Sequence, residues 1–210
     1  MINILIADDH SIVREGLKQI VADSSEMMVQ GEAVNGQQVL DLVHKSEYDL
    51  ILLDISMPGR GGIDTLKQLK ILKPDIPVLI LSMYPEDQYA IRAIKAGASG
   101  YLTKESAPDE LIGAIKKVAR GGKYVSADLA EKLVEGLGEN NAKVDHTILS
   151  DREYQVMVMI ATGKTVKKIA KELSLSVKTI STHRTRALKK MGMENNAEFT
   201  YYAVKLGLVT

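Results

Sequence analysis

The 210-residue sequence contains no cysteine and no tryptophan, and only one phenylalanine and five prolines. Without cysteine the chain can form neither a disulfide framework nor a thiolate metal site, which fits the reducing cytoplasm where we expect it. No apolar run approaches the ~20 residues of a membrane-spanning helix, because the longest candidate, IPVLILSMY, has the length of a strand. The N-terminus MINILIADDH lacks a basic region and soon reaches two acids, so we expect neither a signal peptide nor a membrane partner.

Net charge is also absent, since 27 Lys and Arg balance 27 Asp and Glu. This balance is the sum of two unlike parts. Residues 148–210 carry 11 basic and 5 acidic residues, which leaves 16 basic and 22 acidic residues in the first 147. A basic C-terminal part indicates an anionic partner such as nucleic acid. Attraction between two oppositely charged parts of one chain is the alternative.

The first 122 residues alternate between short apolar runs and segments with helical periodicity. The apolar runs predict strands at residues 3–7, 27–34, 48–54, 77–82 and 100–104. The segments that follow them predict helices at residues 11–24, 35–46, 62–73, 85–97 and 108–120. Five successive strand–helix units predict an α/β fold, with a five-stranded parallel, doubly wound sheet that has helices on both faces.

The remaining sequence predicts a linker and a second, all-helical domain. Residues 126–137 predict one more helix, and the polar segment 138–146 is rich in Gly and Asn. From residue 148 onward the apolar residues recur only with helical spacing. We therefore predict a first domain over residues 1–122, a linker over 123–147 and a small all-α domain over 148–210.

Acidic residues follow two of the predicted strands. Asp8 and Asp9 end the first strand, and Asp54 ends the buried third strand within LILLDISMPGRGG. Ligands of such sheets bind beyond the carboxyl ends of the strands, near the point where the strand order reverses. Three carboxylates that converge there repel one another unless a cation joins them. Oxygen ligands with open positions favour Mg²⁺.

Two further polar residues end the remaining strands. Ser82 closes the fourth strand and Lys104 the fifth. A hydroxyl, an ammonium and a metal ion around one aspartate form a clamp for a phosphoryl group carried on that aspartate. In this interpretation Asp54 attacks in line, while Lys104 and the metal neutralise charge on the transferred oxygens.

These five positions resemble the receiver domain of bacterial two-component response regulators, which has a flavodoxin-like fold, over residues 1–122. The resemblance implies that Asp54 is the phosphoacceptor and that a sensor histidine kinase is its phosphoryl donor. It implies a Mg²⁺ or Mn²⁺ site formed by Asp8, Asp9, Asp54 and the backbone carbonyl of Ser56. It also implies a switch pair, Ser82 and Tyr101. The chain departs from many receivers in having Glu105 instead of proline after Lys104, which excludes a cis X–Pro bond there.

Haloacid-dehalogenase-type phosphatases are an alternative, because they also phosphorylate an aspartate that follows an apolar strand. Their DxD pattern places a second, acid/base aspartate two residues further on. This chain has Ser56 at that position. We therefore expect no enzymatic activity beyond phosphotransfer to Asp54.

The C-terminal residues predict a helix-turn-helix arrangement. Ser150 and Glu153 form a capping pattern at the start of a first helix in residues 149–163. A second helix begins at Thr165, and a short turn leads to a third in VKTISTHRTRALKKMG. Helix, short turn, helix is typical of DNA-binding proteins, in which the later helix enters the major groove.

The third helix has one apolar arc and one polar arc. The apolar arc is predicted to contain Val177, Ile180, Ala187, Leu188 and Met191. We predict that DNA contacts Lys178, Ser181, Thr182, Thr185 and Lys189, together with Thr165 and Lys167 of the second helix. Short hydroxyls between lysines suit base edges flanked by phosphates, and a solvated amphipathic face is the alternative. Arg184 falls in the apolar arc, so we expect it to reach a phosphate or to pair with Glu153.

Residues 148–208 resemble the DNA-binding domain of NarL/FixJ-type (LuxR-class) regulators. The matching segments are LSDREYQVMVMIATGKT, IAKELSLSVKTISTH and AEFTYYAVKLGLV. The position of Ser181 is usually a base-reading lysine in that family, so the target sequence should differ. The resemblance implies a phosphorylation-activated transcriptional regulator that binds double-stranded DNA. It also implies contact with RNA polymerase and a homodimer, formed through the helix at residues 195–206, when phosphorylated or DNA-bound. A binding module whose helical domain only dimerises the protein is the other alternative.

Overall fold

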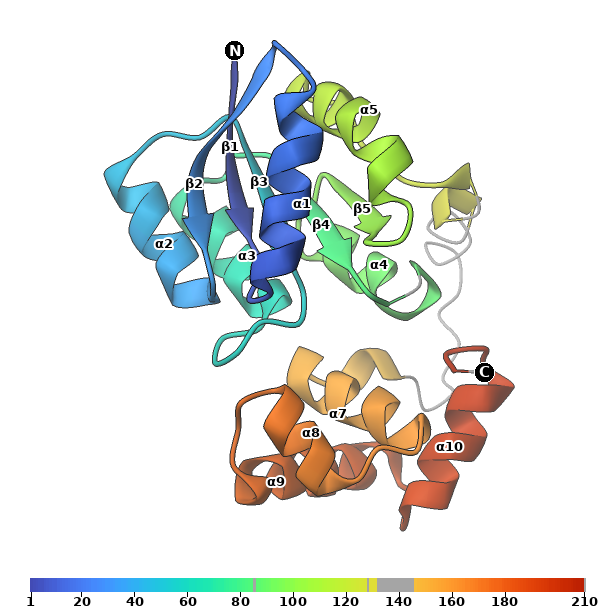
Figure 1. Ribbon diagram of the computed structural model, residues 1–210. Helices are drawn as coiled ribbons and strands as arrows, with labels where there is room; N and C mark the ends of the chain where they lie inside the picture. Colours follow the sequence, from blue (N-terminus) through green and yellow to red (C-terminus); the bar gives the residue numbers. More distant parts are fainter. Residues whose placement is uncertain (85, 128, 132–145, 210) are drawn as a thin grey trace. The chain divides into compact units, whose positions relative to one another are not determined.

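The computed structural model describes residues 1–84, 86–127, 129–131 and 146–209 (Figure 1). The chain forms two compact units, Met1–Leu137 and Gly138–Thr210. Residues 127 and 129–131 are helical, whereas the rest of the predicted helix beyond residue 127, and residues 138–145 of the predicted linker, lie outside the described residues. In the described ranges, no helix has both the length and the apolar character needed to cross a membrane.

The first unit contains a five-stranded parallel sheet. Its strands are β1 (Ile2–Ala7), β2 (Met27–Ala33), β3 (Leu50–Asp54), β4 (Val78–Ser82) and β5 (Gly100–Thr103). The strand order is β2-β1-β3-β4-β5, and all neighbouring strands pair in parallel. The predicted fold class is therefore confirmed. The order reverses between β1 and β3, so the two strands that end in aspartates lie side by side at the switch point.

Helices cover both faces of this sheet (Figure 1). On one face lie α1 (Ser11–Ala22) and α5 (Ala107–Ala119). The other face carries α2 (Gly36–Lys45), α3 (Gly62–Leu72) and α4 (Glu86–Lys95). The core under α1 and α5 includes alternate residues of the three central strands, Ile4, Ile6, Leu50, Leu52, Leu79 and Leu81. Burial on both faces explains why these strands appear in the sequence as continuous apolar runs.

The loop after β3 folds back tightly against the end of that strand. The N–H of Gly62 donates to the carbonyl of Ile55 at 2.9 Å. A Cβ atom at position 62 would lie 2.1 Å from the carbonyl oxygen of Asp54. The first residue of α3 must therefore be glycine for the helix to begin this close to the acidic edge of the sheet.

The second unit is a helical domain. Its elements are the 3₁₀ helix η1 (His146–Ile148), α7 (Asp151–Ala161), α8 (Val166–Glu172), α9 (Val177–Met191) and α10 (Asn196–Lys205). Ser150 and Glu153 form the predicted capping box at the start of α7. The core of this unit includes Tyr154, Met157, Ile169, Ile180 and Phe199, all fully buried. The predicted helix-turn-helix arrangement is confirmed by α8, its short turn and α9.

The structure corrects one prediction about α9 and narrows another. Val177 was placed in the apolar arc, but 48% of it is exposed, because it lies in the first turn, ahead of Ile180. Arg184 donates from Nε to Oδ1 of Asn196 rather than pairing with Glu153, and its contact with a phosphate stays a prediction. Glu153 is instead 2.6 Å from Nζ of Lys190.

The pairing of Glu153 determines its ionisation. Burial opposes its charged form, but the bonds from Lys190 and from Ser150 outweigh burial and lower the pKa of the Glu153 carboxyl. The carboxylate is thus held at the junction of α7 and α9, with 5% of its side chain exposed.

Candidate functional site

Three charged side chains from different strand ends meet at the carboxyl edge of the sheet. Asp8 directly follows β1, Asp54 is the last residue of β3 and Lys104 directly follows β5. Lys104 Nζ lies 2.6 Å from Asp8 Oδ2 and 2.9 Å from Asp54 Oδ2, so one ammonium bridges two carboxylates. Only 2% of each acidic side chain and 8% of the lysine side chain are exposed. The sequence predicted this convergence of Asp8, Asp54 and Lys104.

The charges in this buried group do not balance. Burial raises the pKa of Asp54; Lys104 opposes this shift, and Asp8 adds to it. Burial also disfavours the ammonium of Lys104, but Asp54 and Asp8 together hold its pKa above the ordinary value. Two carboxylates and one ammonium leave a net negative charge in a site with little water, so a second cation is electrostatically favoured.

A hard cation fits the donor atoms at this edge. One ligand atom from each of Asp8, Asp9, His10 and Asp54 lies within 4.8 Å of the others. Asp54 Oδ1 is buried and has no hydrogen-bond partner among the described residues. Carboxylate oxygens with an open position are the ligands that Mg²⁺ prefers. The residues present therefore suit the divalent metal that the receiver resemblance implies.

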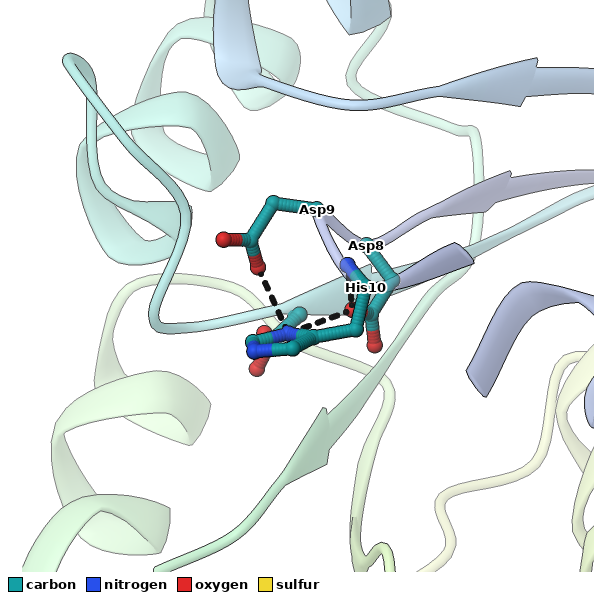
Figure 2. Close-up of side chains that lie close together, drawn as sticks. Asp8, Asp9 and His10 are labelled. Atoms are coloured by element: carbon teal, nitrogen blue, oxygen red, sulfur yellow. Dashed lines mark hydrogen bonds and ion pairs between the residues drawn. The ribbon is translucent and has the colours of Figure 1, made fainter. Parts of the chain in front are cut away.

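Two residues that the sequence interpretation did not select also contact this cluster. Figure 2 shows the His10 ring beside the carboxylates of Asp8 and Asp9, and its Nδ1 lies 3.3 Å and 3.0 Å from their Oδ1 atoms. Arg14 of α1 donates from Nη1 to the backbone carbonyl of Asp8 at 2.8 Å. The position of His10 directly after the two aspartates was the available signal, whereas the reach of Arg14 follows from how α1 packs.

The predicted switch residues are joined through the backbone of Tyr84. The N–H of Tyr84 donates to Ser82 Oγ at 3.0 Å, and the Tyr84 carbonyl accepts from the Tyr101 hydroxyl at 2.7 Å. Ser82 and Tyr101 are both fully buried. Burial raises the pKa of Tyr101, so its phenol remains a neutral hydrogen-bond donor. Any change at Ser82 can therefore reach Tyr101 through the backbone of Tyr84.

The loop that carries Lys104 is held by side chains rather than by a proline. The Lys104 N–H donates to the carbonyl of Ser82 at 2.8 Å. The N–H of Ser106 donates to Thr103 Oγ1 at 3.2 Å, and the hydroxyls of these two residues lie 3.1 Å apart. No peptide bond in the described ranges is cis. Glu105 thus lies in a loop whose shape is set by the hydroxyls of its neighbours.

The polar arc of α9 lies on the surface of the second unit. Lys178, Thr182, Thr185 and Lys189 are exposed, as are Thr165 and Lys167, and Ser181 is half-buried. The Thr182 hydroxyl donates to the Lys178 carbonyl at 2.9 Å, so its oxygen is left to accept. Thr165 caps α8 by accepting from the Lys168 N–H. Arg186 is also exposed on α9 and was not among the predicted contacts.

Comparison with known proteins matches both parts of the chain to families. Residues 4–116 match the response regulator receiver domain, and residues 147–203 match the bacterial regulatory proteins of the luxR family. The response regulator UvrY of Escherichia coli strain K12 is 34% identical over 209 residues, which cover 99% of this chain and 96% of UvrY. The response regulator GacA of Pseudomonas aeruginosa is 35% identical over 210 residues, which cover 100% of this chain and 98% of GacA.

A solved structure has the same two-part organisation. RcsB from Salmonella enterica serovar Typhimurium, bound to a promoter in the presence of the phosphomimetic BeF₃⁻, is 29% identical with a TM-score of 0.67. That alignment covers 99% of each chain. The chain is therefore a response regulator of the NarL/FixJ family, in which a receiver domain is joined to a LuxR-type DNA-binding domain.

Proposed function

We propose that this response regulator is switched when a sensor histidine kinase transfers a phosphoryl group to Asp54. The observation that carries the proposal is the state of the Asp54 carboxylate. Its Oδ2 is 2.9 Å from Lys104 Nζ, while its buried Oδ1 has no hydrogen-bond partner among the described residues. One oxygen is thus held by a cation, and the carboxylate keeps lone pairs for a metal ion and for the attack on phosphorus.

The chemistry is a direct displacement at phosphorus. A lone pair on a carboxylate oxygen of Asp54 forms the new P–O bond, and the P–N bond to the donor histidine breaks with its electron pair on nitrogen. The Lys104 ammonium lies where it can neutralise charge on the transferred oxygens. The hydroxyl of Ser82, which ends the neighbouring strand β4, supplies a donor to the same group.

A divalent metal is part of the proposal. Asp8, Asp9 and Asp54 would hold Mg²⁺ or Mn²⁺ through carboxylate oxygens, together with the backbone carbonyl of Ser56. When bound, the ion neutralises charge on the phosphoryl oxygens. The unequal charges of the buried group and the clustering of the ligand atoms within 4.8 Å support this assignment.

The output of the switch is promoter binding through α9. Lys178, Ser181, Thr182, Thr185 and Lys189 would contact DNA from α9, with Thr165 and Lys167 contributing from the start of α8. The relative RcsB has been solved bound to promoter DNA, and also as two dimers bound to two parallel DNAs. These relatives support a DNA-bound homodimer for this chain. We further propose that the regulator contacts RNA polymerase and acts in the cytoplasm.

Phosphorylation with a small donor tests the proposal directly. Full-length protein is incubated with acetyl phosphate and Mg²⁺, and intact-mass spectrometry counts the adducts. The DNA is a duplex selected for binding from a random-sequence pool, here called the selected promoter DNA. The wild type should gain one phosphate and bind this DNA more tightly. Asp54→Ala should gain no phosphate and show no increase in affinity for the DNA. A full adduct on Asp54→Ala would remove Asp54 from the role of acceptor.

A further inference from the structure

We propose that residues 123–126, here called the edge segment, couple phosphorylation of Asp54 to the start of the interdomain linker. The proposal rests on the phosphoryl transfer proposed above. The segment begins four residues after the end of α5 at Ala119 (Figure 1). It forms the start of the predicted linker, residues 123–147. A change in how the segment is bonded to the receiver therefore changes where the linker begins.

The edge segment pairs with the open side of β5. Gly100 and Tyr124 form a parallel bridge. The N–H of Tyr124 donates to the Ser99 carbonyl at 2.9 Å, and the Tyr124 carbonyl accepts from the N–H of Tyr101 at 3.1 Å. Because β5 is the last strand of the sheet, this pairing satisfies groups that an edge strand otherwise leaves open. The predicted switch residue Tyr101 is thus bonded through its backbone to the linker.

Gly100 makes this approach possible. A Cβ atom at position 100 would lie 2.6 Å from the carbonyl oxygen of Tyr124 and 2.9 Å from its Cβ. It would also lie 2.9 Å from a methyl group of Leu79 in β4. Backbone atoms cannot yield to a side chain at that distance, so any other residue here separates the edge segment from β5.

Two side chains attach the edge segment to the helices beside β5. The Tyr124 hydroxyl donates to Glu110 of α5 at 2.5 Å, and this bond raises the pKa of Tyr124 to about 12. The Ser126 hydroxyl donates to Glu86, the first residue of α4. Ser126 Oγ also accepts from the N–H of Leu129 at 3.1 Å, so the residue that contacts α4 also caps the helical turn that follows.

Two routes therefore lead from the phosphorylation site to the same short segment. In the first route, Ser82 Oγ accepts from the N–H of Tyr84, and the carbonyl of Tyr84 accepts from the Tyr101 hydroxyl. The N–H of Tyr101 then donates to the carbonyl of Tyr124. The other route is the bond from the Ser126 hydroxyl to Glu86, the first residue of the helix that comes after β4 in the chain. A hydroxyl that donates to a phosphoryl oxygen becomes a better acceptor, since linked hydrogen bonds strengthen one another. Phosphorylation should thus tighten both routes and hold the segment against β5.

The test compares full-length variants with and without acetyl phosphate and Mg²⁺. Gly100→Ala separates the segment from β5, and Ser126→Ala removes the contact with α4 while leaving the sheet intact. Gly113→Ala is the matched control, because a Cβ there meets nothing within 4 Å. Each protein is assayed for phosphate by intact mass, for amide exchange at Tyr101 and Tyr124, and for affinity to selected promoter DNA.

In wild type and Gly113→Ala, phosphorylation should slow exchange at both amides and raise DNA affinity. Gly100→Ala and Ser126→Ala should still take up one phosphate, but their gain in DNA affinity should shrink by about two- to tenfold, the effect of losing roughly one neutral hydrogen bond. If phosphorylation raises the DNA affinity of both variants as much as that of the wild type, the coupling is wrong, and Asp54 remains the acceptor. Absence of phosphate on the wild type overturns both proposals.

Discussion

Replacing Lys104 with methionine should destabilise the receiver by a predictable amount. The change keeps most of the side-chain volume and removes the ammonium that lies 2.6 Å from Asp8 and 2.9 Å from Asp54. Breaking a buried ion pair in this way costs about 3–5 kcal/mol. Coulomb's law gives a similar figure, because two like charges that lie within 4.8 Å of each other repel by at least about 3.5 kcal/mol at an effective dielectric constant of about 20.

The loss should also depend on pH in a defined direction. Burial already raises the pKa of Asp54, and removal of the ammonium raises it further. A carboxyl whose pKa is higher in the folded state than in the unfolded state lowers stability as pH rises between those two values. The loss in free energy of unfolding relative to wild type should therefore be small near about pH 4 and reach its full size near about pH 7. Mg²⁺ should reduce the stability difference between Lys104→Met and wild type at neutral pH, because the cation replaces the missing positive charge.

Urea unfolding of the full chain measures this effect. The receiver transition is identified by its shift with Mg²⁺ and is compared in EDTA at both pH values. Lys45→Met is the control, since Lys45 is exposed in the last turn of α2 and its loss should change stability by less than about 0.5 kcal/mol. Unfolding of Lys104→Met at the wild-type urea concentration, in EDTA at neutral pH, would contradict a stabilising role for the Lys104 ammonium. A loss of the same size at acidic pH would contradict the predicted pH dependence.

Four further variants test other parts of the chain. Gly62→Ala should destabilise the receiver by about 1–3 kcal/mol and slow phosphorylation, because its Cβ would lie 2.1 Å from the Asp54 carbonyl oxygen; unfolding and adduct formation would both report this. Glu153→Gln should destabilise the second unit by about 1 kcal/mol at neutral pH. Because the folded-state pKa of Glu153 is lowered, the wild type should lose this advantage as pH falls through that value, and a pH-independent difference in melting temperature would contradict the assignment. Lys178→Ala should weaken binding to selected and random duplexes alike and reduce the salt slope by about one unit. Thr182→Ala should weaken binding to the selected duplex more, by about 1–3 kcal/mol, and an equal loss on both would indicate backbone contact only.

The architecture of the receiver and the meeting of charged residues at its acidic edge could both be predicted from the sequence. Continuous apolar runs that alternate with helical periods can be buried only in a parallel sheet with two covered faces. In such a sheet all carboxyl ends lie at one edge, so Asp54, Ser82 and Lys104 must converge whatever the details of packing. The capping box at Ser150 was equally readable, because both of its bonds lie within four residues of sequence.

Pairs of side chains that lie far apart in the sequence could be identified only from the folded structure. Helical periodicity placed Arg184 on the correct side of α9, but it could not distinguish Asn196 from Glu153 as its partner, because both lie on other helices. Arg14 reaches the backbone of Asp8 because of how α1 packs on the sheet. The pairing of Tyr124 with β5 has no local signal, since the bonds join residues more than 20 positions apart and depend on the space left by a single glycine. Such contacts follow from the packing of whole elements, which a one-dimensional pattern does not encode.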